Sequence, residues 1–109
     1  MRIHYDGKRF RNTHDGPQAP LATYRQDGDL LWADFGGGTV CRGGLTGLVD
    51  PDGRLDFTYT MTTADGRTIA GHCSSVPELL PDGRIRLREQ WERYGEHAAS
   101  GVSYLEEVR

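Results

Sequence analysis

Residues 54–77, RLDFTYTMTTADGRTIAGHCSSVP, contain two alternating segments on either side of an Asp-Gly pair. In the first segment, polar residues separate four apolar ones, which are Leu55, Phe57, Tyr59 and Met61. A period of two is typical of a strand with one buried and one solvated face. Asp-Gly between two such segments is the strongest short-range signal for a hairpin, because both residues accept positive φ more readily than most. The stretch therefore predicts an antiparallel β-hairpin.

The same combination of alternation and turn residues recurs along the whole chain. Six Asp-Gly pairs occur, at residues 6–7, 15–16, 27–28, 52–53, 65–66 and 82–83. The segments between them predict strands at about 2–11 (either continuous or broken by Asp6-Gly7), 20–26, 29–36, 39–49, 54–63, 67–77, 83–94 and 99–107. No window combines helical periodicity with caps, and the one helical turn that we expect lies around Pro77 to Leu80.

The number of strands and the shortness of the connections decide the architecture. About eight strands in a chain of this length leave little connecting chain for Greek-key crossovers, which favours a meander over a sandwich. A meander that closes on itself also removes the sheet edges that invite aggregation. We therefore expect an all-β fold: a single up-and-down antiparallel β-barrel of about eight strands with little or no helix, in one domain over residues 1–109.

Net charge and hydropathy indicate which classes of binding partner and which cellular compartment to expect. Thirteen Lys and Arg against sixteen Asp and Glu give a net charge of -3, so we expect no nucleic-acid partner. The opening MRIHYDGKRF lacks the apolar core of a secretory signal, and no ten consecutive residues are apolar, so we expect a cytoplasmic protein without a membrane partner. Cys41 and Cys73 fall two strands apart, at roughly 10 Å, which predicts two free thiols.

Alternation sends one carboxylate toward the interior. In the segment 84–92, Glu89 shares its face with Leu87 and Trp91, whereas the arginines between them point outward. Burial penalises an ionised carboxylate, so the pKa of Glu89 is expected to rise toward neutrality. Two interpretations stay open: Glu89 serves a function, or it bonds an inward tyrosine or Arg93 and only fixes the register. A β-bulge near Glu89 would turn it outward and remove the argument.

Several other polar and aromatic side chains are predicted to point inward. They are Tyr24, Gln26, Tyr59, Cys73 and Ser75. An eight-stranded barrel has an interior just wide enough for packed side chains or for one small ligand. Polar groups among aromatic ones are typical of a small-molecule site. The inward face of residues 39–49 is predicted to hold Cys41, Gly43, Leu45, Gly47 and Val49, where the glycines permit curvature or a close approach.

Other features favour structural interpretations. Arg84, Arg86 and Arg88 form an alternating basic stripe, which indicates a solvated face of cross-strand ion pairs. Trp32 is expected on the face opposite to Leu31, where an exposed tryptophan would favour a contact surface and self-association as a homodimer.

Metal binding and covalent catalysis find little support in the sequence. The histidines form no His-x-His pair, and His72 points to the opposite face from Cys73, so we expect no metal site and no cofactor. Ser75 has no Gly-x-Ser-x-Gly context, and no helix is predicted beside Cys73 to activate its thiol.

A family resemblance covers most of the chain. Its more specific elements are Cys73-x-Ser75-x-Pro77-Glu78 followed by Glu89-x-Trp91, and Leu80-Pro81-Asp82-Gly83 adds a less specific turn. With these residues the chain resembles small bacterial proteins of the lipocalin-like (calycin) barrel type, which are often labelled N-acetylglutamate synthase. The resemblance implies a barrel. Acetyltransferase activity is not expected, because an acyl-CoA acetyltransferase of the usual type needs a mixed α/β domain with a loop that grips pyrophosphate.

Three functions remain open at this point. The first is binding of a small, partly apolar molecule in the interior, by the residues Tyr24, Tyr59, Cys73, Ser75, Glu89 and Trp91. The second is a cofactor-free isomerase or cyclase that uses Glu89 as general acid or base. The third is a structural or self-associating protein with a filled core.

Overall fold

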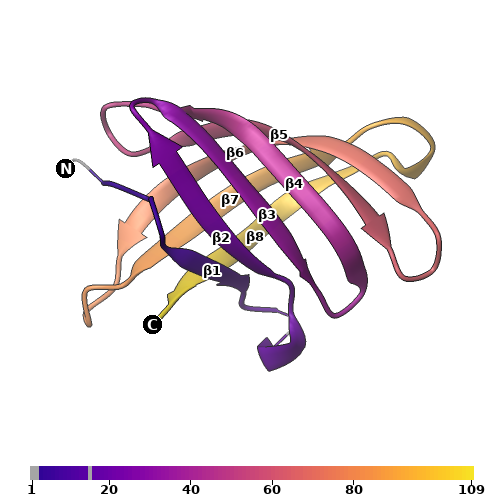
Figure 1. Ribbon diagram of the computed structural model, residues 1–109, viewed down its shortest axis with the longest axis horizontal. Helices are drawn as coiled ribbons and strands as arrows, with labels where there is room; N and C mark the ends of the chain where they lie inside the picture. Colours follow the sequence, from indigo (N-terminus) through magenta and orange to yellow (C-terminus); the bar gives the residue numbers. More distant parts are fainter. Residues whose placement is uncertain (1–2, 15) are drawn as a thin grey trace.

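The computed structural model describes residues 3–14 and 16–109, and its fold is a closed antiparallel β-barrel (Figure 1). The strands are β1 (Arg9–Asn12), β2 (Leu21–Asp27), β3 (Leu30–Gly37), β4 (Val40–Val49), β5 (Leu55–Thr63), β6 (Thr68–Leu79), β7 (Ile85–Arg93) and β8 (Ala99–Val108). Each strand pairs with the next along the chain, and β8 closes the barrel by pairing with β1. The described part of the chain also contains two single turns of 3-10 helix, η1 (Gly16–Gln18) and η2 (Gly95–His97). The predicted all-β, up-and-down barrel is confirmed.

The structure differs most from the prediction around β1 and at the end of β6. Of the expected strand 2–11, only the part from Arg9 onward belongs to β1, and Asp6-Gly7, the pair considered as a break, forms a turn in which Gly7 has a φ of 82°. Residue 2 lies outside the described residues. The helical turn expected around Pro77 to Leu80 is wrong, since β6 continues to Leu79. β5 pairs with β6 only as far as Ser75, so the extension that holds Pro77 is paired on one side, where a strand accommodates a residue without an N–H.

Three hairpins share one turn geometry. In each, a glycine N–H closes a four-residue turn and a second backbone bond follows one residue later, as in Gly53 to Asp50 at 3.0 Å and Asp50 to Arg54 at 2.9 Å. The turns at Gly66 and Gly83 repeat both bonds. This is a type I turn followed by a residue in the left-handed region, which Asp-Gly supplies through its glycine. Asp15, of the pair 15–16, lies outside the described residues.

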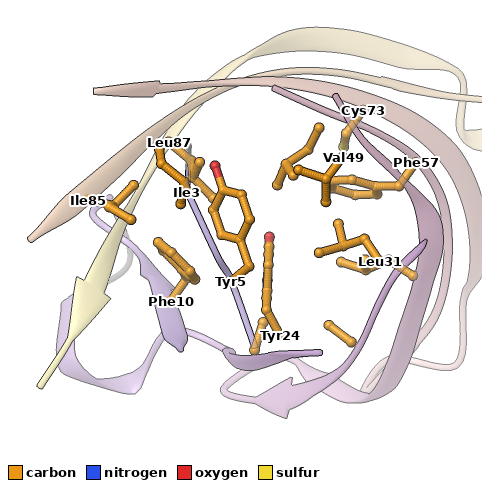
Figure 2. Packing of buried hydrophobic residues seen from close by; sticks show 14 residues of the cluster. Ile3, Tyr5, Phe10, Tyr24, Leu31, Val49, Phe57, Cys73, Ile85 and Leu87 are labelled. Carbon is orange, nitrogen blue, oxygen red and sulfur yellow. The ribbon is translucent and has the colours of Figure 1, made fainter. Parts of the chain in front are cut away.

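The N-terminal segment closes one end of the barrel. Residues 3–8 cross the end that carries the turns 28–29, 50–54 and 80–84, where Ile3 packs against Gly53. Tyr5 is 0% exposed, and its hydroxyl donates to the carbonyl of Gly53 at 2.6 Å. Figure 2 shows the rings of Tyr5 and Tyr24 standing side by side within the barrel, with Phe10 next to them. This end is therefore filled by side chains.

Aromatic rings in the rest of the barrel lie against glycines of the next strand. Phe35 pairs with Gly43, Tyr59 with Gly71 and Trp91 with Gly101, and in each case a Cβ on the glycine would collide with the ring. Glycine in a strand allows a ring from the neighbouring strand to lie over its backbone. The rings consequently line the wall and leave the space along the barrel axis open.

Gly47→Ala is expected to lower the free energy of unfolding by about 1–3 kcal/mol, the usual cost of overpacking. A Cβ at Gly47 would collide with the carbonyl oxygen of Asp56 and with the Cα of Phe57, which are held in the β4–β5 ladder. Urea denaturation monitored by tryptophan fluorescence measures the effect. Gly44→Ala on the same strand is the matched control, because its Cβ would meet only the carbonyl oxygen of Ala33 at 3.7 Å. Equal stabilities of the two variants would contradict the prediction.

The predicted inward face of β4 is correct except at one residue. Leu45 and Val49 are buried, but Cys41 is exposed because the register shifts between Val40 and Arg42 and turns Val40 inward. Cys73 is buried, and both thiols are free. Within the described ranges, no helix has the length and apolar character needed to cross a membrane.

Candidate functional site

The open half of the barrel contains a cavity of about 590 Å³. It reaches from the ring of Tyr24 to the end that carries the turns 38–39 and 64–67, since Thr39, Ala64 and Arg67 belong to its lining. Its wall is mostly apolar and includes Phe10, Ala22, Phe35, Leu45, Phe57, Met61, Ile69 and Leu105. The volume lies within the range of small-molecule sites, roughly 300–1,000 Å³.

Glu89 points into this cavity, as alternation predicts. β7 pairs with β6 and β8 without a register shift, so Leu87 is buried, Arg88 and Gln90 are exposed, and Glu89 faces the interior. Burial raises the pKa of Glu89 to about 7, and a hydrogen bond with the Cys73 thiol opposes part of that shift. Glu89 is therefore a cavity carboxyl that titrates near neutral pH.

The other polar groups beside Glu89 stay protonated at neutral pH. Burial raises the pKa of the Cys73 thiol, and the neighbouring Glu89 carboxylate raises it further. Burial likewise raises the pKa of Tyr24, with a further increase from Glu89. The pKa of Tyr59 is also raised by burial, while Arg93 opposes the shift. An inert thiol and neutral hydroxyls thus surround one titrating carboxyl, so the structure does not support Cys73 as a nucleophile.

Trp91 forms a rigid part of the cavity wall. Its Nε1–H donates to the Oγ of Ser103 at 2.9 Å, which fixes the plane of the indole. The guanidinium of Arg93 lies over the ring, 5.2 Å from its centroid, on the side toward the cavity mouth. Both Trp91 and Arg93 line the cavity.

A sequence comparison decides the family of this barrel. The model of a family described as avidin-like protein matches residues 3–108, from the N-terminal segment through β8. The chain belongs to the avidin-like family. The match supports the calycin-type barrel that the resemblance implied, and it does not address the N-acetylglutamate synthase label. No curated protein matches the chain.

The avidin-like barrel gathers five of the six predicted site residues around one cavity. They are Tyr24, Tyr59, Cys73, Glu89 and Trp91. Ser75 is absent from the lining: it is 1% exposed, pairs directly with Glu89 across β6 and β7, and its Oγ has no partner among the described residues. Gln26 supports the closed end instead, where its side chain accepts from the Tyr5 N–H at 2.9 Å and donates to Gly28.

If Glu89 only fixed the strand register, it would bond Arg93 or an inward tyrosine. Within residues 3–14 and 16–109, no hydrogen bond or ion pair joins Glu89 to Arg93 or to a tyrosine. From the sequence, Arg93 was considered only as a bonding partner of Glu89. The alternation that places Glu89 and Trp91 inside continues to Arg93, and that signal could have added Arg93 to the predicted site.

The outer face of the avidin-like barrel agrees with the predicted ion-pair surface. Arg86 on β7 pairs with Glu78 on β6 at 2.7 Å, and its guanidinium lies 4.9 Å from the ring centroid of Tyr104. Arg84 pairs with Asp82 at 2.6 Å and with Glu106 on β8 at 3.6 Å. These contacts account for two of the three arginines of the stripe, and Arg88 is exposed without an ion pair among the described residues.

Two further predictions concern the outer face. His72 points outward to the carboxylate of Asp56 at 2.7 Å, away from Cys73, and the described residues contain no cluster of three metal-ligating side chains. Trp32 is 38% exposed on the outer face of β3, next to exposed Leu30 and Leu48. Self-association through this face stays a prediction.

Proposed function

We propose that this avidin-like barrel binds one small, partly apolar molecule in its cavity. Tyr24, Tyr59 and Trp91 contact the apolar part, and Glu89 with the Cys73 thiol hydrogen-bonds a polar group at the inner end. The observation that carries the proposal is the cavity itself, because a filled core would leave neither a volume of about 590 Å³ nor a carboxyl facing it. The cavity argues against the filled core of the third function considered from the sequence, whereas self-association through the face of Trp32 stays a prediction.

The family and the composition of the cavity support the same proposal. Avidin-like proteins bind small ligands such as biotin, and eight-stranded barrels of this width hold one small ligand. Aromatic walls with a few convergent polar groups are typical of such sites. Biotin is therefore the first ligand to test, within a library of small metabolites.

Trp91→Ala is expected to abolish ligand-dependent stabilisation. A ligand at one hundred times its Kd stabilises the native state by about 2.7 kcal/mol, which raises the melting temperature of a domain of this size by several degrees. Removal of the indole takes away the wall that Ser103 holds in place. Thermal-shift measurements with biotin and the metabolite library test this expectation. Trp32→Ala is the matched control, because Trp32 lies outside the barrel and its loss should leave the ligand response intact. The proposal fails if no compound stabilises the wild type, or if Trp91→Ala responds like Trp32→Ala.

The pKa of Glu89 favours a second candidate function. A carboxyl with a pKa of about 7 suits general acid or base catalysis near neutral pH, so the site fits a cofactor-free isomerisation, cyclisation or hydration of the bound molecule. In this case Glu89→Gln abolishes turnover while binding persists. A pKa of about 4.3, measured for Glu89 by NMR titration, would remove the rationale.

A further inference from the structure

Ser75 carries a buried hydroxyl that the proposed binding site does not use. Its side chain is 1% exposed, it lies outside the cavity lining, and its Oγ has no hydrogen-bond partner among residues 3–14 and 16–109. Buried polar groups in native proteins are nearly always hydrogen-bonded, because burial removes their bonds to water. The Ser75 hydroxyl is therefore expected to find its partner in a second arrangement of the neighbouring side chains.

Glu89 lies directly opposite Ser75 across the β6–β7 ladder. The Leu80 N–H donates to the Arg84 carbonyl at 2.8 Å, so residues 80 and 84 bond across this ladder. Pair types alternate along antiparallel strands, and Ser75 lies five positions from Leu80, so Ser75 and Glu89 form a non-hydrogen-bonded pair. In such a pair the Cα atoms are about 4.5 Å apart and the side chains are at their closest. The carboxyl of Glu89 can therefore reach the Ser75 hydroxyl by side-chain rotation alone.

The carboxyl of Glu89 instead turns toward the cavity. It hydrogen-bonds the thiol of Cys73, the next inward residue of β6, which lines the cavity. A thiol is a weak donor, whereas a hydroxyl forms a short and strong bond to a carboxylate. An ionised Glu89 consequently gains more from Ser75 than from Cys73, and a neutral carboxyl lacks that charge-assisted gain.

The other groups that face Glu89 are neutral or already bonded. Tyr24 on β2 and Tyr59 on β5 stay protonated at neutral pH, because burial raises the pKa of each hydroxyl. Ser103 on β8 pairs with Glu89 in the ladder, and its Oγ accepts an indole N–H. Arg93 hydrogen-bonds the Tyr59 hydroxyl and forms no ion pair with Glu89 within the described ranges. Ser75 thus offers an unused donor beneath the cavity lining.

Resting on the proposed binding function, we propose that Ser75 is a positioning residue that withdraws the ionised Glu89 carboxylate from the cavity. While the proton is present, the carboxyl stays beside Cys73 and presents its O–H and carbonyl oxygen to a ligand. When the proton leaves to solvent, the side chain rotates to Ser75, whose hydroxyl donates to the carboxylate beneath the lining. The inner end of the cavity then loses its carboxyl, so the protonated form alone binds a polar ligand group there. Burial raises the pKa of Glu89 to about 7, so both positions are populated near neutral pH.

The first test measures the carboxyl itself and uses no ligand. Carbon-13 NMR follows the titration of the Glu89 side chain in the wild type, Ser75→Ala and Ser74→Ala. Ser75→Ala removes the donor of the ionised form, so we expect its midpoint to lie about one pH unit above that of the wild type, the size of effect that loss of a charge-assisted hydrogen bond produces. Ser74 is exposed on the outer face of β6, so Ser74→Ala should titrate like the wild type. An unchanged or lower midpoint in Ser75→Ala overturns the proposal.

The second test locates the carboxyl through the Cys73 thiol. In a Cys41→Ser background Cys73 carries the remaining thiol, and its Raman S–H band moves to lower frequency when the thiol donates a hydrogen bond. We expect this band to shift to the frequency of a free thiol as the pH rises through about 7, and to stay low when Ser75→Ala is added. A band that stays low at high pH with Ser75 in place overturns the rotation. Because neither test contains a ligand, their failure leaves the cavity proposal standing, and failure of the thermal-shift test leaves the rotation standing.

Discussion

At pH 8 the Glu89→Gln variant is expected to be more stable than the wild type by about 3 kcal/mol, whereas at pH 4 the two stabilities should agree. The folded-state pKa of Glu89 is about 7 against 4.5 for the free group, so the native state binds the proton more tightly than the unfolded state. The wild type therefore loses stability as the pH rises from about 4.5 to 7, at about 1.4 kcal/mol per unit of pKa difference. Glutamine is neutral at every pH and avoids this loss. Urea denaturation between pH 4 and pH 8 measures both curves.

The matched control for this experiment is Glu96→Gln. Glu96 lies exposed in η2 and does not line the cavity, so Glu96→Gln removes the same charge as Glu89→Gln without changing the cavity wall. Parallel curves for the wild type and Glu89→Gln would mean that Glu89 is solvated, and the second candidate function would lose its basis. A ligand that fills the cavity should change the pH at which the two curves diverge, because it alters the solvation of the carboxyl.

Tyr5→Ala is expected to destabilise the barrel by about 3–5 kcal/mol, the range for loss of a fully buried aromatic side chain. Tyr5 fills the closed end, where its ring centroid lies 6.2 Å from those of Phe10 and Tyr24. The substitution removes this packing and the hydroxyl bond to Gly53 together. Chemical denaturation at a fixed pH gives the loss directly.

Tyr5→Phe separates the two contributions. It keeps the ring and removes only the hydroxyl, so the carbonyl of Gly53 loses a buried donor at a cost of about 1–3 kcal/mol. His4→Ala is the control, since His4 is exposed beside Tyr5. If Tyr5→Ala proved as stable as His4→Ala, residues 3–8 would not close the barrel in solution.

The site was predictable from sequence only where it depends on strand alternation. Glu89 and Trp91 point inward because β7 keeps a period of two without a bulge, and Tyr24 and Cys73 follow the same rule on their own strands. Alternation assigns a face but not a depth along the barrel. For that reason it grouped Ser75 with the site, although the structure buries Ser75 outside the cavity lining.

Cys41 and Arg93 show two further limits of the same pattern. A β-bulge changes the phase of alternation, and the bulge in β4 exposes Cys41 without a signal in the local residue types. Arg93 also points inward, although inward positions of a strand are usually apolar. Its observed contact, the face of Trp91, depends on how the two side chains pack in the folded barrel.

The sequence by itself determined the strands, the hairpin turns, the closed meander and the inward direction of Glu89. These features depend on local chemistry: a period of two sorts side chains between two faces, and glycine after aspartate permits the backbone to reverse. Only the tertiary structure decided that residues 3–8 close one end, that aromatic rings lie flat over glycines, and that a cavity remains at the other end. Those outcomes require contacts between segments far apart in the chain, and the space left by such packing has no counterpart in any single stretch of sequence.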